Sequence, residues 1–127
     1  MGRIVELSPT NWEEASKSNI LTVVYFWHEQ CAWCRMLTPI FDEVAAEYNG
    51  KIKFAKLNVL ESQANQEMAA NLGVMSTPTL MFLCSGRPVG QVVGLMSKED
   101  LKKTLDEMPV RYKTCIRQST DLRNYVV

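Results

Sequence analysis

The sequence has no excess of either charge, because 14 lysines and arginines balance 14 aspartates and glutamates. Proteins that bind nucleic acids usually carry a basic face, so this balance argues against such a partner. No apolar run approaches the roughly 20 residues that a membrane-spanning helix needs. The short apolar stretch at the N-terminus is broken by Glu6 and does not resemble the core of a secretory signal peptide. We therefore expect a cytoplasmic protein that binds neither nucleic acid nor membranes.

Residues that bind metal ions are also few. The chain has one histidine, His28, and four cysteines, of which only Cys31 and Cys34 lie close together in the sequence. A structural zinc site needs four ligands, usually in two close pairs. Cys84 ends an apolar run and should be buried, whereas Cys115 lies in a polar C-terminal stretch. The pattern favours redox chemistry over half of a zinc site or a pair of unreactive thiols, and we expect no bound metal.

The segment Cys31-Ala32-Trp33-Cys34 is the most informative feature of the chain. Two cysteines at this spacing can close a small disulfide ring, and the reduced pair can attack the disulfide of another protein. The apolar run over 21–27 predicts a buried strand, and helical spacing begins at Cys34. At such a junction the N–H groups and partial positive charge of the helix N-terminus stabilise a thiolate and lower the pKa of the first cysteine. A thiolate is the attacking species in disulfide exchange.

The remaining hydrophobic pattern predicts a single α/β domain over residues 1–108. We expect strands at 4–7, 21–27, 52–59, 80–83 and 89–93, and helices at about 12–18, 34–48, 62–72 and 98–108. Pro39 should kink the second helix, and Pro109 should end the last one. This order predicts a central mixed five-stranded sheet flanked by four helices, with a parallel core and an antiparallel edge. Residues 109–127 form a largely basic C-terminal extension.

Four segments, in this order, resemble the thioredoxin family over roughly residues 4–108. They are Phe26-Trp27-His28-Glu29-Gln30-Cys31-Ala32-Trp33-Cys34-Arg35-Met36-Leu37-Thr38-Pro39, Lys56-Leu57-Asn58-Val59, Ser76-Thr77-Pro78-Thr79-Leu80 and Val93-Gly94. The resemblance implies the thioredoxin fold and a thiol–disulfide oxidoreductase that reduces protein disulfides. It also implies that the redox-active disulfide serves in place of a cofactor. The implied partners are disulfide-containing target proteins and an upstream reductase, flavin-dependent or ferredoxin-linked, and we expect a monomer.

The resemblance also assigns roles to single residues. Cys31 would be the attacking thiol, and Cys34 would be the resolving thiol that breaks the mixed disulfide. Thr77–Pro78 would be a cis peptide lying against the two cysteines, where the backbone of Thr77 can pair with an extended substrate segment. Gly94 would leave room for the substrate backbone. Trp33, between the cysteines, would form an apolar lip of the binding groove.

Several positions depart from the family pattern. Ala-Trp separates the cysteines instead of Gly-Pro, and Gln30 replaces a tryptophan. Tyr25 occupies the place of a buried aspartate that helps relatives deprotonate the resolving cysteine, and a tyrosine with a pKa near ~10 is a poor base at neutral pH. We therefore expect slower resolution and a narrower range of targets. His28 is either a proton shuttle or a simple strand-end histidine, and Lys56 is either a proton-transfer group or a solvated lysine.

A second function is compatible with the same residues. The fold can serve as a protein-interaction module, in which the groove binds a partner and the cysteines have a secondary redox role or none. Turnover of a model disulfide distinguishes the two functions, because a binding module does not need Cys34.

Overall fold

The computed structural model describes residues 4–17, 20–48 and 50–111, with side chains up to residue 107. One mixed sheet contains five strands in the order β1-β3-β2-β4-β5. The strands are β1 (Ile4–Glu6), β2 (Thr22–Trp27), β3 (Lys53–Asn58), β4 (Thr79–Cys84) and β5 (Arg87–Val93). The first three strands run parallel, whereas β4 is antiparallel to both β2 and β5. The predicted parallel core with an antiparallel edge is confirmed.

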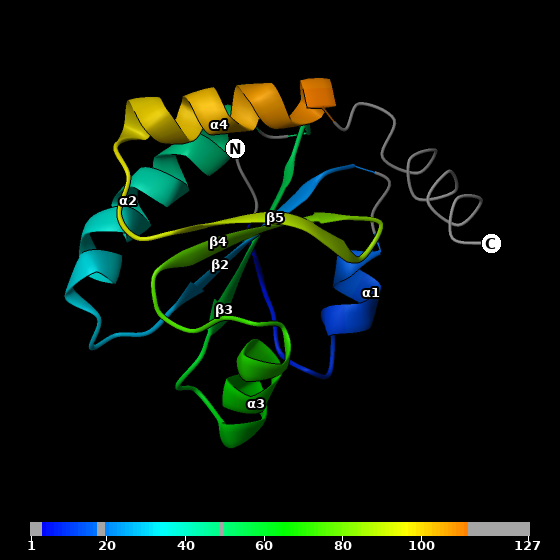
Figure 1. The fold of residues 1–127 in the computed structure, drawn as a ribbon, viewed down its shortest axis with the longest axis vertical. Helices are drawn as coiled ribbons and strands as arrows, with labels where there is room; N and C mark the ends of the chain where they lie inside the picture. Colours follow the sequence, from blue (N-terminus) through cyan, green and yellow to red (C-terminus); the bar gives the residue numbers. More distant parts are fainter. Residues whose placement is uncertain (1–3, 18–19, 49, 112–127) are drawn as a thin grey trace.

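Helices cover both faces of this sheet. They are α1 (Trp12–Ser16), α2 (Ala32–Glu47), α3 (Gln63–Asn71) and α4 (Lys98–Arg111). Helices α2 and α4 lie over one face, and α1 and α3 lie over the other (Figure 1). The part of the chain that the structure describes therefore has the five strands and four helices that the sequence predicts.

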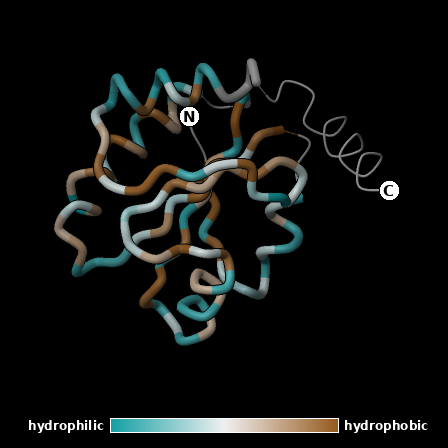
Figure 2. Tube along the Cα trace, viewed as in Figure 1, coloured by the Kyte–Doolittle hydropathy of each residue, from teal (hydrophilic) through white to brown (hydrophobic). Residues whose placement is uncertain are grey.

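Strand β2 is central because it is apolar on both faces. Val23 and Tyr25 point into the core beneath α2 and α4, whereas Val24 and Phe26 point into the core beneath α1 and α3. All four side chains are fully buried. Figure 2 shows hydrophobic residues along the strands and hydrophilic residues on the outer turns of the helices. Burial of apolar surface on both faces fixes the strand that leads into the cysteine pair.

The start of α2 and the end of α4 differ from the prediction. Helix α2 begins at Ala32, two residues earlier than expected, and continues through Pro39. Helix α4 runs to Arg111, so the expectation that Pro109 ends it is wrong. Leu101 and Leu105 are fully buried and hold the preceding turns of α4 against the sheet, and the helix extends only two residues beyond the proline. Residues 112–127, including Cys115, lie outside the described residues, and the proposed division of the chain at residue 108 stays a prediction.

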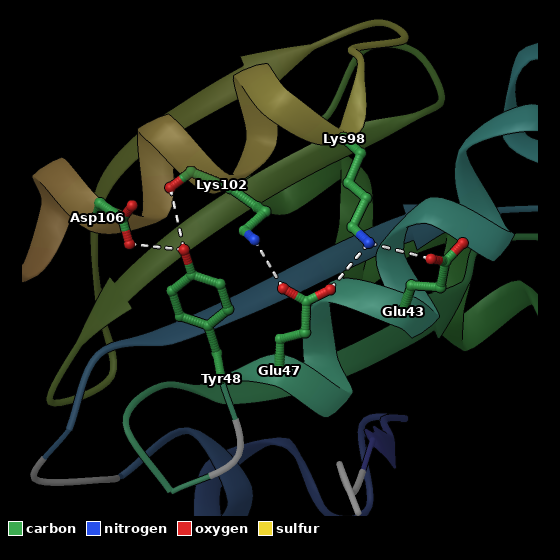
Figure 3. Close-up of polar contacts among 6 residues, drawn as sticks. All are labelled: Glu43, Glu47, Tyr48, Lys98, Lys102 and Asp106. Atoms are coloured by element: carbon green, nitrogen blue, oxygen red, sulfur yellow. Dashed lines mark hydrogen bonds and ion pairs between the residues drawn. The ribbon is translucent and has the colours of Figure 1, made fainter.

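A polar cluster joins α4 to the end of α2 (Figure 3). Lys98 pairs with Glu43 at 3.1 Å and with Glu47 at 2.8 Å, and Lys102 pairs with Glu47 at 2.7 Å. Hydrogen bonds from the two lysines lower the pKa of Glu47 to about 2. The hydroxyl of Tyr48 donates to a carboxylate oxygen of Asp106 at 2.6 Å, and burial together with this bond raises the pKa of Tyr48 to about 12.

Candidate active site

Cys31 and Cys34 form a disulfide at the junction of β2 and α2, with their Cα atoms 5.2 Å apart. Strand β2 ends at Trp27, residues 28–30 connect it to the helix, and Cys31 is the N-cap residue of α2. Its sulfur accepts a hydrogen bond from the backbone N–H of Cys34 at 3.2 Å. The prediction that the pair lies at a strand-to-helix junction is therefore confirmed.

The two cysteines differ in their access to solvent. Cys31 keeps 8% of its surface exposed, whereas Cys34 keeps 1%. The sulfur of Cys31 also lies at the N-terminus of α2, where the helix dipole and a backbone N–H group favour a negative charge on it. An incoming disulfide can therefore reach Cys31 more easily than Cys34, and Cys31 has the better environment for a thiolate.

The Thr77–Pro78 peptide bond is cis, as the resemblance predicted. Strand pairing brings this bond to the end of the sheet that carries the cysteines, because Thr79 pairs with Phe26 near the end of β2. The same residue pairs with Val93 of β5, and the N–H of Gly94 donates to the carbonyl of Pro78 at 2.9 Å. The C-terminal ends of β2 and β5 and the start of β4 therefore bring the disulfide, the cis peptide and Gly94 together at one end of the sheet.

Gly94 has a backbone conformation that side chains disfavour. Its φ of +102° lies in the region that glycine adopts without steric cost. Apart from the two neighbouring residues in the chain, no described atom lies within 4 Å of the place that a Cβ atom would take here. The structure thus gives a backbone reason for glycine here, and it leaves the adjacent space open.

Two surface grooves lie beside these segments. One, of about 460 Å³, is lined by Trp27, His28, Glu29, Cys34, Arg35, Thr38 and Pro39. The other, of about 290 Å³, is lined by His28, Val59, Leu60, Gln66, Ala69, Ala70, Val74, Met75, Ser76 and Thr77. Thr77 thus borders a groove lined largely by apolar residues, and His28 takes part in both grooves.

Apolar side chains are exposed around the same end of the sheet. Among the described residues, the large exposed apolar side chains are Ile20, Trp33, Met36, Leu60, Met75, Val93 and Leu95. All except Ile20 belong to the first two turns of α2 or to segments at this end of β3, β4 and β5. Trp33 is 58% exposed and Met75 is 91% exposed. This end of the sheet therefore offers apolar surface to a binding partner.

Tyr25 lies beneath Cys34 and bonds to its backbone. Its hydroxyl donates to the carbonyl oxygen of Cys34 at 2.9 Å and lies 2.9 Å from the hydroxyl oxygen of Thr38. Burial raises the pKa of Tyr25 above its ordinary value, so the residue stays neutral near pH 7 and is a poor base, as predicted. Sequence reasoning did not single out Thr38, although it lies one helical turn after Cys34 and so shares its face.

The other aromatic and basic candidates have distinct places. Trp27 packs against the core beneath α2, as expected. Lys56 pairs with Asp42 of α2 at 3.1 Å, a contact that sequence reasoning missed. His28 follows directly after β2 and is half-buried, and within the described residues neither its Nδ1 atom nor the Nε1 atom of Trp27 has a hydrogen-bond partner. Both alternative roles of His28 stay predictions.

Two further observations concern metals and membranes. Within residues 4–17, 20–48 and 50–111, no group of three or more histidine, cysteine or acidic side chains is arranged to hold a metal ion. None of the helices in those ranges is long and apolar enough to cross a membrane.

Comparison with known proteins identifies the family. Residues 3–107 match the family model of thioredoxin. A thioredoxin of Staphylococcus haemolyticus is 39% identical over 104 residues, which cover 82% of this chain and 96% of that protein. Thioredoxin 1 of a Nostoc species is 40% identical over 95 residues (75% and 86%), and a thioredoxin of Staphylococcus aureus is 38% identical over 104 residues (82% and 96%). Since the matched region contains every strand, the disulfide and the cis-proline, the chain belongs to the thioredoxin family and is a thiol–disulfide oxidoreductase.

Proposed function

We propose that Cys31 is the attacking thiol and Cys34 the resolving thiol of this protein disulfide reductase. The observation that carries this assignment is the difference in environment between the two cysteines. Cys31 is the more exposed and caps the helix N-terminus, whereas Cys34 is sheltered in the first turn. The first step needs an accessible thiolate, and the second needs a thiol that stays away from other partners.

The reaction has two balanced steps. In the reduced protein, the Cys31 thiolate attacks one sulfur of the target disulfide, a mixed disulfide forms, and the other target sulfur leaves as a thiolate. The Cys34 thiolate then attacks the Cys31 sulfur, which releases the second target thiolate and leaves the Cys31–Cys34 disulfide. The released thiolates take up protons, so the target gains two electrons and the protein becomes oxidised.

The substrate-binding role falls to residues around the disulfide. An extended target segment would pair with the backbone of Thr77, next to the cis-proline Pro78. Its path would cross Gly94, where the space that a side chain would fill is open. Trp33 would form an apolar lip with its exposed ring. The neighbouring groove of about 290 Å³ would receive an apolar side chain of the target.

Members of the family act on disulfide-containing targets and are returned to the dithiol state by a reductase. For this chain we propose a flavin-dependent or ferredoxin-linked reductase, a monomeric state and a cytoplasmic location. We also propose that no cofactor is needed, because the two electrons reside in the cysteine pair itself. Within the chain, residues 1–108 would form the catalytic domain, and residues 109–127 would be an extension to it.

The test uses two cysteine variants with an insulin-reduction assay and a capture assay. Cys34→Ser should accumulate a mixed disulfide with the target, because attack occurs and resolution does not. Cys31→Ser should neither turn over nor capture the target, and it serves as the matched control. Full turnover by Cys31→Ser would overturn the assignment. Target binding by the native chain without any turnover would instead support the interaction-module function.

A further inference from the structure

Two hydroxyl groups converge on the backbone carbonyl of the resolving cysteine. The Tyr25 hydroxyl donates to the carbonyl oxygen of Cys34 at 2.9 Å, and the Thr38 hydroxyl lies 2.9 Å from the same oxygen. The two hydroxyl oxygens are also 2.9 Å apart. One of these groups comes from the helix itself and the other from strand β2, so the triangle joins the first turn of α2 to the centre of the sheet.

The helix needs this support just after Cys34. Pro39 has no N–H to donate to the carbonyl of Arg35, and its ring crowds that carbonyl. The regular ladder is therefore interrupted in the turn that follows the cysteine pair. A hydrogen bond from the sheet fixes the backbone of Cys34 independently of this ladder.

The Tyr25 side chain is itself rigidly placed. It is fully buried, and its ring lies 5.0 Å from the ring of Phe41, which in turn lies 5.5 Å from that of Phe54. Through these contacts the hydroxyl is anchored to β2, α2 and β3 together. A buried donor in a packed aromatic cluster keeps its position while the surface around the cysteines contacts a target.

We propose that Tyr25 is a positioning residue for resolution, and that its hydroxyl holds the backbone of Cys34 so that the Cys34 sulfur stays within reach of Cys31. This inference rests on the roles proposed above for the two cysteines. In the step concerned, the bond between Cys34 and Cys31 forms, the bond between Cys31 and the target breaks, and the target thiolate leaves. Tyr25 moves no proton in this step, because its hydroxyl is engaged with the Cys34 carbonyl throughout.

The inference predicts that the two steps respond differently to loss of the hydroxyl. Tyr25→Phe keeps the ring and its packing, so the first attack by Cys31 should keep its rate. Resolution should slow about tenfold, because a small misplacement of a reacting group costs a large part of the benefit of proximity. The pH dependence of resolution should keep its shape while the rate falls at every pH, since no base has been removed.

The experiment measures each step alone. Attack is followed as the second-order rate of mixed-disulfide formation in Tyr25→Phe/Cys34→Ser, compared with Cys34→Ser. Resolution is followed by rapid acid quench as the lifetime of the mixed disulfide in Tyr25→Phe with Cys34 intact. Tyr48→Phe is the matched control, because it removes a hydroxyl whose partner Asp106 lies on α4, and it should alter neither step.

Thr38 provides an independent variant. Thr38→Val removes the second hydroxyl and should also slow resolution alone, whereas Thr38→Ser keeps the hydroxyl and should restore the rate. Unchanged resolution in Tyr25→Phe would overturn the inference, as would equal slowing of attack and resolution. If Tyr25→Phe does not fold, the Thr38 pair decides the question by the same criteria. None of these outcomes affects the proposed function, which fails if Cys31 proves dispensable or if the native chain binds targets without turnover.

Discussion

The exposed ring of Trp33 provides the sharpest prediction about targets. The side chain is 58% exposed and lies between the two cysteines. A tryptophan can bury up to about 250 Å², so about 145 Å² of this ring is available to a partner. At about 25 cal/mol per Å², complete coverage contributes at most about 3.6 kcal/mol, and coverage of half the ring contributes about 1.8 kcal/mol. Trp33→Ala should therefore lower kcat/KM for a protein disulfide by about 20-fold.

The assay compares a large and a small substrate. We expect insulin to cover the ring during reduction, whereas a small aliphatic disulfide such as hydroxyethyl disulfide should reach the Cys31 sulfur without covering it. Trp33→Ala should lose activity on insulin, mainly through a higher KM, and keep nearly native activity on the small disulfide. Trp33→Phe retains a flat apolar ring and should recover most of the loss.

A change in the redox chemistry of the cysteine pair is the main alternative explanation for a loss of activity in Trp33→Ala. The equilibrium potential of each variant therefore has to be measured alongside the rates. Equal losses on both substrates, or a potential that shifts in step with the rates, would show that Trp33 acts on the dithiol and not through contact. Native activity of Trp33→Ala on insulin would show that targets do not cover the ring.

The remaining predictions concern stability. Phe41→Ala removes a fully buried ring and should lower the free energy of unfolding by about 3–5 kcal/mol in urea titrations; a loss well below 2 kcal/mol would contradict the packing described. Tyr48→Phe should cost about 1 kcal/mol near neutral pH. Because the pKa of Tyr48 is raised from 10.0 to about 12, this difference should be complete below pH 10 and vanish as the pH rises to about 12. Glu47 has a lowered pKa of about 2, so the advantage of the native chain over Glu47→Gln should be present above pH 4.5, decline as the pH falls toward 2, and shrink with added salt. Persistence of the Tyr48 difference at pH 12, or insensitivity of the Glu47 difference to acid and salt, would refute these assignments.

The central strands β2, β3 and β4 were predictable because their apolar runs match the burial that the structure shows. The run 21–27 is apolar at every position except Thr22, which suits a strand covered on both faces, and β2 occupies 22–27 with five of its residues buried. The start of α2 was harder to predict from the pattern of apolar residues. Ala32, Trp33, Arg35 and Met36 are all exposed, so the first turn has little apolar periodicity to indicate a helix before Cys34.

The end of α4 shows a different limit. A proline inside a helix removes one hydrogen bond and crowds one carbonyl, and this local cost predicts a stop at Pro109. Burial of Leu101 and Leu105 against the sheet is a tertiary contribution that local rules do not include. The prediction therefore placed the end of the helix three residues too early.

Around the cysteine pair, features within short segments were predicted, whereas contacts between distant elements were not. The order of the motifs was sufficient to predict the junction and the cis-proline, because both depend on short segments. The hydrogen bond from Tyr25 to Cys34 joins β2 to α2, and the ion pair of Lys56 with Asp42 joins β3 to α2. A single sequence carries no direct record of such contacts. The spacing of four residues from Cys34 to Thr38 was nevertheless available as a signal of a shared helix face.

The two steps of disulfide exchange make opposite demands on the cysteines, and one helix terminus meets both. Attack needs a sulfur that is accessible and stabilised as an anion, which Cys31 obtains as the N-cap residue. Resolution needs a sulfur that is sheltered yet held near its partner, and in the proposed mechanism Cys34 meets this need in the first turn above the Tyr25 hydroxyl. A neutral hydroxyl beneath Cys34 would fix its position without a buried charge, whereas a carboxylate at that place would introduce such a charge at a large desolvation cost. The proposed role of Tyr25 thus replaces assistance by a buried acid with geometric control of resolution, and the rates of Tyr25→Phe would measure that control.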